Sequence, residues 1–293
     1  MQQLTTSFFY PGQMRGLIRI LRPKQWVKNG FVLAPLIFSG QFSNELSVKK
    51  AAVAMLLFCI ASSATYVLND LHDVEQDRLH PIKSTIRPLA SGLIRLRLAY
   101  FLLGFLYVLL FAAWWLVPAV GCVIGGYLLL NIAYTYALKH QPVIDIFIIA
   151  FGFVFRVYAG AVAIAVPVSS WMLITTLSLA LYLAAVKRRQ ELSQHGHESR
   201  KVLDRYTIPL INRYAEMAAT SALVFYSMFV ISSRPNLVVT IPVVLFGLFR
   251  YWYVVEALDG GESPTDALLR DKPLLLSIIS WILVSVWVIY IPN

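Results

Sequence analysis

The sequence predicts an all-α protein that crosses a membrane many times. Its 293 residues are 58% hydrophobic and only 14% charged, and the mean hydropathy is +0.68. Such values lie far from those of a soluble domain of this length. Apolar stretches recur along the whole chain and leave no room for a separate soluble domain. We therefore expect a single integral-membrane domain over residues 1–293.

Nine apolar stretches account for the predicted helices, since about 20 apolar residues cross the hydrocarbon core as a helix. The first stretch is short and can begin earlier as an interfacial helix. Only Val117 and Pro118 separate the third from the fourth, and proline at this point favours a tight turn. The predicted spans are residues 26–40, 51–69, 97–117, 119–137, 143–164, 170–186, 208–232, 237–257 and 274–291.

The connections between these spans differ in charge, which predicts the orientation of the chain. Basic residues crowd every second connection, whereas the other connections hold only Lys49, Lys50 and Arg234. The positive-inside rule then places the N-terminus in the cytoplasm and the C-terminus outside, as an odd number of spans requires. The net charge of +10 is mostly this topology signal. The same face would also attract an anionic substrate, and we expect no nucleic-acid partner.

A dense acidic cluster follows the second span directly, in Asn69-Asp70-Leu71-His72-Asp73-Val74-Glu75-Gln76-Asp77. Carboxylates are expensive in lipid and rarely gather at a membrane boundary without a function. If the helix continues, about 100° per residue puts Asp70 and Asp77 about 20° apart and Asp73 about 60° from Asp70. The three carboxylates would then face one side and bind Mg²⁺, which uses one or two carboxylates together with substrate phosphates. A solvated acidic loop is the plainer alternative.

The connections on the same face carry side chains suited to phosphate. Lysine and arginine supply charge, and the arginine fork favours two hydrogen bonds to one phosphate. The X-Pro steps at Pro81 and Pro88 keep their loop extended, so we expect Lys83 and Arg87 on a structured loop and not on a helix. The basic groups taken singly are also compatible with topology signals or interfacial anchors. The candidate phosphate-binding residues are Lys24, Lys28, Asn69, Lys83, Arg87, Tyr134, Lys139, Lys187 and Arg188.

Arg156 lies deep in the fifth span, where a charge is unexpected. Eleven positions separate it from Asp145, which is about three turns and about 20° of rotation, so both side chains face the same way. A buried arginine in a bilayer needs a partner or a wet cavity. Two interpretations stay open: Arg156 pairs with Asp145 or a backbone carbonyl, or it reaches into a cavity toward substrate phosphate. The small residues Gly152 and Gly160 nearby suit close helix packing.

Four segments of the chain resemble the UbiA superfamily of intramembrane prenyltransferases, and in particular its phosphoribosyltransferase branch. The resemblance covers nearly the whole chain. It implies nine transmembrane helices around a central cavity, which agrees with the number of apolar stretches. The four segments are Arg22-Pro23-Lys24-Gln25-Trp26-Val27-Lys28-Asn29, Asp77-Arg78-Leu79-His80-Pro81 with Arg87-Pro88-Leu89-Ala90-Ser91-Gly92, Gly152-Phe153-Val154-Phe155-Arg156 with Ala159-Gly160, and Lys187-Arg188-Arg189-Gln190-Glu191-Leu192.

One departure from the superfamily pattern bears on the substrate. Typical members carry a second Asp-x-x-x-Asp at the start of the fifth span and grip an isoprenyl diphosphate through several Mg²⁺ ions. Here Asp145 is followed four residues later by Ile149, so the second cluster has one carboxylate, and Asp145 stays a candidate substrate-binding residue. The resemblance then implies the phosphoribosyl branch, whose donor is phosphoribosyl diphosphate and whose acceptor is a polyprenyl phosphate such as decaprenyl phosphate.

On this resemblance, the enzyme transfers a 5-phosphoribosyl group to the lipid phosphate, releases diphosphate and depends on Mg²⁺. The aspartates of the acidic cluster would be catalytic and bind the metal, and Lys24, Lys28 or Arg156 would receive the lipid phosphate. The alternative is a UbiA-type prenyltransferase that moves an isoprenyl group from a prenyl diphosphate to an aromatic acceptor. A transporter is disfavoured, because its ionisable groups would lie near the midplane. A homo-oligomer is compatible with the sequence, which marks no interface.

Overall fold

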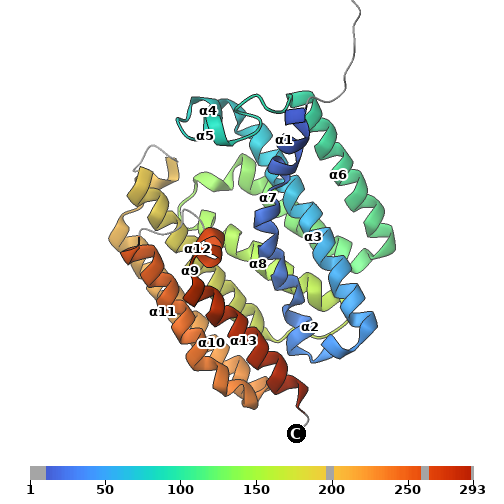
Figure 1. The fold of residues 1–293 in the computed structure, drawn as a ribbon, viewed down its shortest axis with the longest axis vertical. Helices are drawn as coiled ribbons and strands as arrows, with labels where there is room; N and C mark the ends of the chain where they lie inside the picture. The colour runs from blue at the N-terminus through green and yellow to red at the C-terminus, as the bar shows by residue number, and fades with distance from the viewer. Residues whose placement is uncertain (1–10, 196–200, 259–263, 292–293) are drawn as a thin grey trace, which may run out of the picture.

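The computed structural model describes residues 11–195, 201–258 and 264–291, and over these ranges the chain forms helices and connecting turns without a strand. The α-helices are α1 Pro11–Leu21, α2 Ala34–Phe38, α3 Glu45–His72, α4 Val74–Leu79, α5 Lys83–Ile86, α6 Leu96–Leu116, α7 Pro118–Tyr136, α8 Ile144–Ala163, α9 Ser170–His195, α10 Ile208–Ser233, α11 Ile241–Ala257, α12 Pro264–Arg270 and α13 Lys272–Tyr290. The 3-10 helices are η1 Pro23–Leu33, η2 Gln41–Ser43, η3 Leu138–His140, η5 Lys201–Arg205 and η6 Pro235–Thr240. Figure 1 shows a bundle with α1, α4 and α5 at one end and α2 at the other.

Eight helices within the described ranges are long and apolar enough to cross a membrane. They are α3, α6, α7, α8, α9, α10, α11 together with η6, and α13. They overlap eight of the nine predicted spans. α6 ends at Leu116 and α7 begins at Pro118, so the predicted turn at Val117 and Pro118 is confirmed. Large apolar side chains such as Phe101, Trp115 and Leu283 are exposed on them, which suits contact with lipid. The prediction of an all-α polytopic membrane protein is confirmed.

The first predicted span, residues 26–40, is not a regular α-helix. The chain there forms η1 and the short α2, which together run through the bundle from α1 to its opposite end (Figure 1). Gly30 and Pro35 weaken an α-helix at these positions. The fully buried Asn29 side chain also bonds to α3 and α8. Tertiary contacts of a polar residue therefore take precedence over regular helical structure in this segment.

Close packing of η1 on α8 fixes the centre of the bundle. α8 lies between η1, α7 and α9, and α9 in turn packs along α10. At the contact, Gly160 of α8 faces the Val32 carbonyl so closely that a Cβ atom on residue 160 would lie 1.9 Å from the Val32 oxygen. Glycine alone leaves room for such an approach. About one turn away, the same contact brings Arg156 beside Asn29, so this packing positions a charged group in the interior.

Gly160→Ala is expected to destabilise the protein, because the added methyl group overlaps the Val32 carbonyl and overpacking an interior costs about 1–3 kcal/mol. Thermal unfolding of the purified protein in detergent would show a lower midpoint. Gly104→Ala on α6 is the matched control, since no atom lies within 4 Å of its Cβ position and alanine favours a helix over glycine by about 1 kcal/mol. Equal midpoints for the two variants would refute the close contact.

Candidate active site

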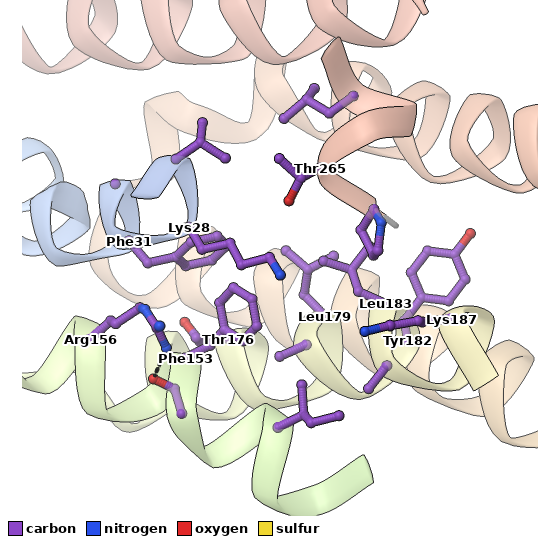
Figure 2. A pocket seen from close by; sticks show the side chains of 18 of the residues that line it. Lys28, Phe31, Phe153, Arg156, Thr176, Leu179, Tyr182, Leu183, Lys187 and Thr265 are labelled. Atoms are coloured by element: carbon purple, nitrogen blue, oxygen red, sulfur yellow. Dashed lines mark hydrogen bonds between the residues drawn. The ribbon is translucent and has the colours of Figure 1, made fainter. Parts of the chain in front are cut away.

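A cavity of about 1300 Å³ opens inside the bundle. Its walls come from η1 and from the helices α2 to α5 and α7 to α13. Charged side chains line the end where α3 and α4 meet, and apolar side chains such as Phe229 and Trp281 line much of the rest. Figure 2 shows part of this cavity, where Lys28, Arg156 and Lys187 lie among apolar neighbours. The volume exceeds the roughly 300–1,000 Å³ of an ordinary small-molecule pocket.

The predicted acidic cluster lies where α3 ends and α4 begins. Asp73 itself is not helical, yet its amide donates to the Asn69 carbonyl at 2.9 Å and the Asp77 amide donates to the Asp73 carbonyl at 2.8 Å. The helical course is therefore nearly continuous, which keeps the carboxylates together. Asn69, Asp73 and Asp77 line the cavity, and Asp70 is buried beside them at 2% exposure.

Asp70 is held by two arginines that line the cavity. Its Oδ1 accepts hydrogen bonds from Arg22 Nη2 at 2.5 Å and from Arg87 Nη1. Its Oδ2 is buried and has no hydrogen-bond partner in the described part of the chain. Arg22 has a left-handed φ of 52°, which non-glycine residues rarely adopt, and its guanidinium stacks 4.8 Å from the Tyr66 ring centroid. Asp70 therefore orients Arg87, a predicted phosphate-binding candidate, and Arg22, a second cation of the cavity lining.

Asp77 and Asp73 each face a cation from another segment. Asp77 Oδ1 lies 3.9 Å from Lys83 Nζ, and Asp77 Oδ2 lies 3.4 Å from Arg87 Nη1. Burial raises the pKa of the Asp77 carboxyl, and the positive charges of Arg87 and Lys83 oppose this rise. Asp73 Oδ1 accepts a hydrogen bond of 2.6 Å from Lys139 Nζ on η3. Cations therefore neutralise the acidic cluster at the same end of the cavity.

The expectation that Lys83 lies outside a helix is wrong. Lys83 begins the short helix α5. An X-Pro step restricts only the residue before the proline, and His80 and Arg87 are indeed extended, with ψ angles of 129° and 125°. The residues between them are free to form one helical turn, which brings the Lys83 ammonium to Asp77.

Asp145 on α8 forms a buried ion pair with Arg188 on α9. Asp145 Oδ2 accepts from Arg188 Nε at 2.6 Å, and Oδ1 accepts from the Tyr206 hydroxyl at 2.8 Å. Arg188 also donates to Glu191 at 2.6 Å and to the Tyr134 hydroxyl at 3.2 Å. Asp145 and Arg188 are 0% and 1% exposed and lie outside the cavity lining, whereas Tyr134 belongs to it. The geometry of the two charged residues is that of a support behind the cavity wall.

Arg156 reaches the cavity from the middle of α8. Its Nε donates to Asn29 Oδ1 at 2.7 Å, and its Nη1 donates to the Gly152 carbonyl at 2.6 Å. The expected alternative of a pair with Asp145 is wrong, because Asp145 is taken by Arg188. The backbone carbonyl partner and the place in the cavity wall are both confirmed. Three aromatic rings have centroids 5.2 to 5.5 Å from the guanidinium carbon, those of Phe58, Tyr127 and Phe153.

Two further lysines point into the cavity from different walls. Figure 2 shows Lys28 on η1 and Lys187 on α9 extending toward each other. Lys187 Nζ lies 3.7 Å from Glu191 Oε1. Lys24, four positions before Lys28, is exposed and lies outside the cavity lining. Of the two lysines that the sequence suggested for binding the lipid phosphate, Lys28 therefore lies in the cavity and Lys24 does not.

The oxygens beside the cavity fit a divalent cation whose coordination a ligand completes. Within the described ranges, no three His, Cys, Asp or Glu side chains are grouped so that they could hold a metal ion by themselves. Asp73, Asp77 and Asn69 nevertheless offer oxygens to the cavity, and Asp70 Oδ2 is a further buried oxygen without a described partner. Mg²⁺ commonly takes one or two carboxylates and fills its remaining positions with phosphate and water oxygens. The donor set therefore suits Mg²⁺ bound together with a phosphate ligand.

Arg22 and Asn29 were not predicted as site residues. Arg22 contacts Asp70 across 48 positions of the sequence, and Asn29 contacts Arg156 across 127 positions. No local spacing connects residues so far apart. The sequence held one indication of both residues: they stand at the two ends of the Arg22-to-Asn29 segment, which carries part of the family resemblance.

Known proteins are similar in sequence to this chain over most of its length. Residues 31–269 match the UbiA prenyltransferase family. The chain is 36% identical to a decaprenyl-phosphate phosphoribosyltransferase of Mycolicibacterium smegmatis, over 91% of this chain and 90% of that protein. It is 35% identical to the protein of the same name from Corynebacterium glutamicum, over 94% of this chain and 87% of that protein.

Solved structures share the fold. A UbiA homologue from Archaeoglobus fulgidus bound to GPP and Mg²⁺ aligns with a TM-score of 0.73 at 19% identity, over 94% of this chain and 100% of that one. A digeranylgeranylglyceryl phosphate synthase aligns with a TM-score of 0.65 at 18% identity, over 94% and 98% of the two chains. Sequence and fold agree: the chain belongs to the UbiA prenyltransferase family.

Proposed function

We propose that the protein transfers a 5-phosphoribosyl group from phosphoribosyl diphosphate to a polyprenyl phosphate, with decaprenyl phosphate as the first acceptor to test. The observation that carries this proposal is the charge pattern of the cavity. Carboxylates and cations suited to a metal-bound diphosphate stand at one end, and further cations stand beside apolar walls. The relatives that are named for this reaction match this chain over about nine-tenths of its length, which supports the choice of substrates.

The residues at the charged end would hold the donor by its phosphates. Asp73, Asp77 and Asn69 are the residues that would ligate Mg²⁺. When bound, Mg²⁺ neutralises charge on the diphosphate leaving group, an effect of several kcal/mol. Arg87 and Lys139, which already flank the two aspartates, would donate to phosphate oxygens, and the arginine fork favours two such bonds. Asp70 would act behind them by keeping the arginines in place.

The reaction requires positioning more than acid–base chemistry. The acceptor phosphate is already an anion, so its oxygen can attack C1 of the ribose without a general base. The new C1–O bond forms as the bond from C1 to the diphosphate oxygen breaks, and that electron pair leaves with the diphosphate. Fixed cations at the charged end stabilise the developing negative charge, and the cavity walls hold both substrates in line.

The wall formed by α8 argues against an isoprenyl diphosphate donor. Ile149, which occupies the position of the second aspartate in the superfamily's Asp-x-x-x-Asp pattern, lines the cavity. Asp145, the remaining acid of α8, is directed to Arg188 and Tyr206. α8 therefore presents no carboxylate to the cavity, and one acidic cluster suits a donor that is held largely by lysine and arginine.

We infer that the charged end faces the cytoplasm. α1, α4 and α5 lie together at this end of the bundle (Figure 1), and this part of the chain holds Arg15, Arg19, Arg78, Lys83 and Arg87. The positive-inside rule assigns such a basic end to the cytoplasm. A water-soluble donor would then enter from the cytoplasm, while the lipid acceptor would reach the cavity from the bilayer.

A transfer assay on the purified protein in detergent tests the proposed function directly. Labelled phosphoribosyl diphosphate, decaprenyl phosphate and Mg²⁺ should yield label in the organic phase, and EDTA should abolish it. A parallel reaction contains a labelled prenyl diphosphate and an aromatic acid. Transfer in the parallel reaction alone would replace the proposal with aromatic prenylation.

Asp73→Asn is expected to lower turnover about 100-fold, because loss of roughly 3 kcal/mol of metal-assisted charge stabilisation corresponds to that factor. The Mg²⁺ concentration for half-maximal activity should rise as well, which a magnesium titration would show. Glu75→Gln is the matched control, since this exposed carboxylate in the same segment pairs with Arg78. Full activity of Asp73→Asn would remove Asp73 from the metal site.

Asp145→Asn separates a supporting role from metal ligation. The change leaves the buried Arg188 partly unpaired, and we expect a loss of about 3 kcal/mol, the lower end for a broken buried pair, because Glu191 still contacts Arg188. The thermal unfolding midpoint should fall while the Mg²⁺ dependence of activity stays that of the wild type. An unchanged midpoint with a shifted Mg²⁺ dependence would show that Asp145 ligates the metal.

A further inference from the structure

Two cations in the cavity wall, Lys28 and Arg156, have no carboxylate partner in the described chain. Neither forms an ion pair, and the hydrogen bonds of Arg156 go to neutral groups. The remaining lysines and arginines of the lining all stand within 4 Å of a carboxylate. These pairs are Arg22 and Arg87 with Asp70, Lys83 with Asp77, Lys139 with Asp73, and Lys187 with Glu191.

The surroundings of Lys28 favour an anion. Burial strips water from the ammonium group, and Lys187, Arg156 and Arg22 are close enough to repel it. Asp266 is the acid whose negative charge partly offsets these positive charges. A desolvated cation among like charges is unstable until a negative charge joins it. The positive charge at this point of the cavity is therefore left for a ligand to neutralise.

The geometry of Arg156 is fixed before any ligand binds. Its Nε bond to Asn29 and its Nη1 bond to the Gly152 carbonyl hold the guanidinium against three aromatic rings. Asn29 is itself held by hydrogen bonds of 3.2 Å to Cys59 and Ser62. Since Lys28 is the neighbour of Asn29 in η1, one rigid contact between η1 and α8 presents both cations to the cavity.

We propose that Lys28 and Arg156 form the seat for the phosphate of the polyprenyl acceptor, and this assignment rests on the proposed function. The apolar wall decides between the acceptor phosphate and the 5-phosphate of the donor. Phe31, Phe153 and Leu179 surround the seat (Figure 2), and the apolar lining continues to Trp281 and its neighbours. Thr176 and Thr265 also lie beside the seat (Figure 2), but the predominance of apolar side chains suits the first isoprene units of a lipid better than a ribose, whose hydroxyl groups each need a hydrogen-bonding partner.

Steady-state kinetics of Lys28→Met test the seat, because methionine keeps the apolar stem and removes the charge. The KM for polyprenyl phosphate should rise roughly 10- to 100-fold, as the loss of a charged hydrogen bond predicts, with the KM for phosphoribosyl diphosphate within about twofold of wild type. Lys24→Met removes the same charge from the exposed position four residues earlier. A larger rise in the donor KM, or an equal lipid effect in both variants, would overturn the proposal.

Lipid binding without donor or metal keeps the test independent of catalysis. Wild type should bind a polyprenyl phosphate at least about tenfold more tightly than the polyprenol of equal length, and Lys28→Met should lose this preference. That result supports the seat even if no phosphoribosyl transfer is observed, in which case only the proposed function fails. Arg156→Lys, which retains charge but not the bond geometry to Asn29, serves as a second variant if Lys28→Met does not fold. Equal wild-type affinity for the phosphate and the alcohol would refute the seat.

Discussion

Charge compensation inside an apolar bundle is the constraint on which the rest of this structure depends. The buried or half-buried acids near the cavity form ion pairs with cations from distant segments. These pairs are Asp70 with Arg22, Asp73 with Lys139 and Asp145 with Arg188. Loss of one partner from a buried pair costs about 3–5 kcal/mol. The pairs therefore fix helices relative to each other and, in the same contacts, hold cations in or behind the cavity wall. Stability and the candidate site share the same residues.

The irregular segment between α1 and α2 is what brings polar groups to the middle of the bundle. As a 3-10 helix, η1 packs close enough to α8 for the Val32 carbonyl to lie against Gly160. Asn29 then reaches Arg156, and Lys28 extends into the cavity. Because irregular backbone is tolerated at membrane depth where it lies within protein or lines a cavity, the irregularity of η1 is consistent with a binding function.

The features that could be predicted from the sequence are the local ones. Apolar length and proline placement predict eight of the spans, and helical periodicity keeps Asp73 and Asp77 on the cavity side. The remainder depends on contacts between remote residues, for which no spacing rule exists. Asn29, one of the partners of Arg156, lies 127 positions away, and Asp145 pairs with Arg188, 43 positions away. The same holds for residues 26–40, where apolar length predicts a span but buried hydrogen bonds determine the backbone.

In the proposed reaction, two regions of one cavity take different phosphates: the acidic cluster takes the donor diphosphate, and Lys28 and Arg156, in the middle of the bundle, take the acceptor phosphate. A structure of the protein bound to phosphoribosyl diphosphate and Mg²⁺ measures this most directly. Metal and diphosphate are expected beside Asp73 and Asp77, with Lys28 and Arg156 untouched by donor phosphates. Density for the donor 5-phosphate on Lys28 and Arg156, or a metal ion on Asp145, would contradict it.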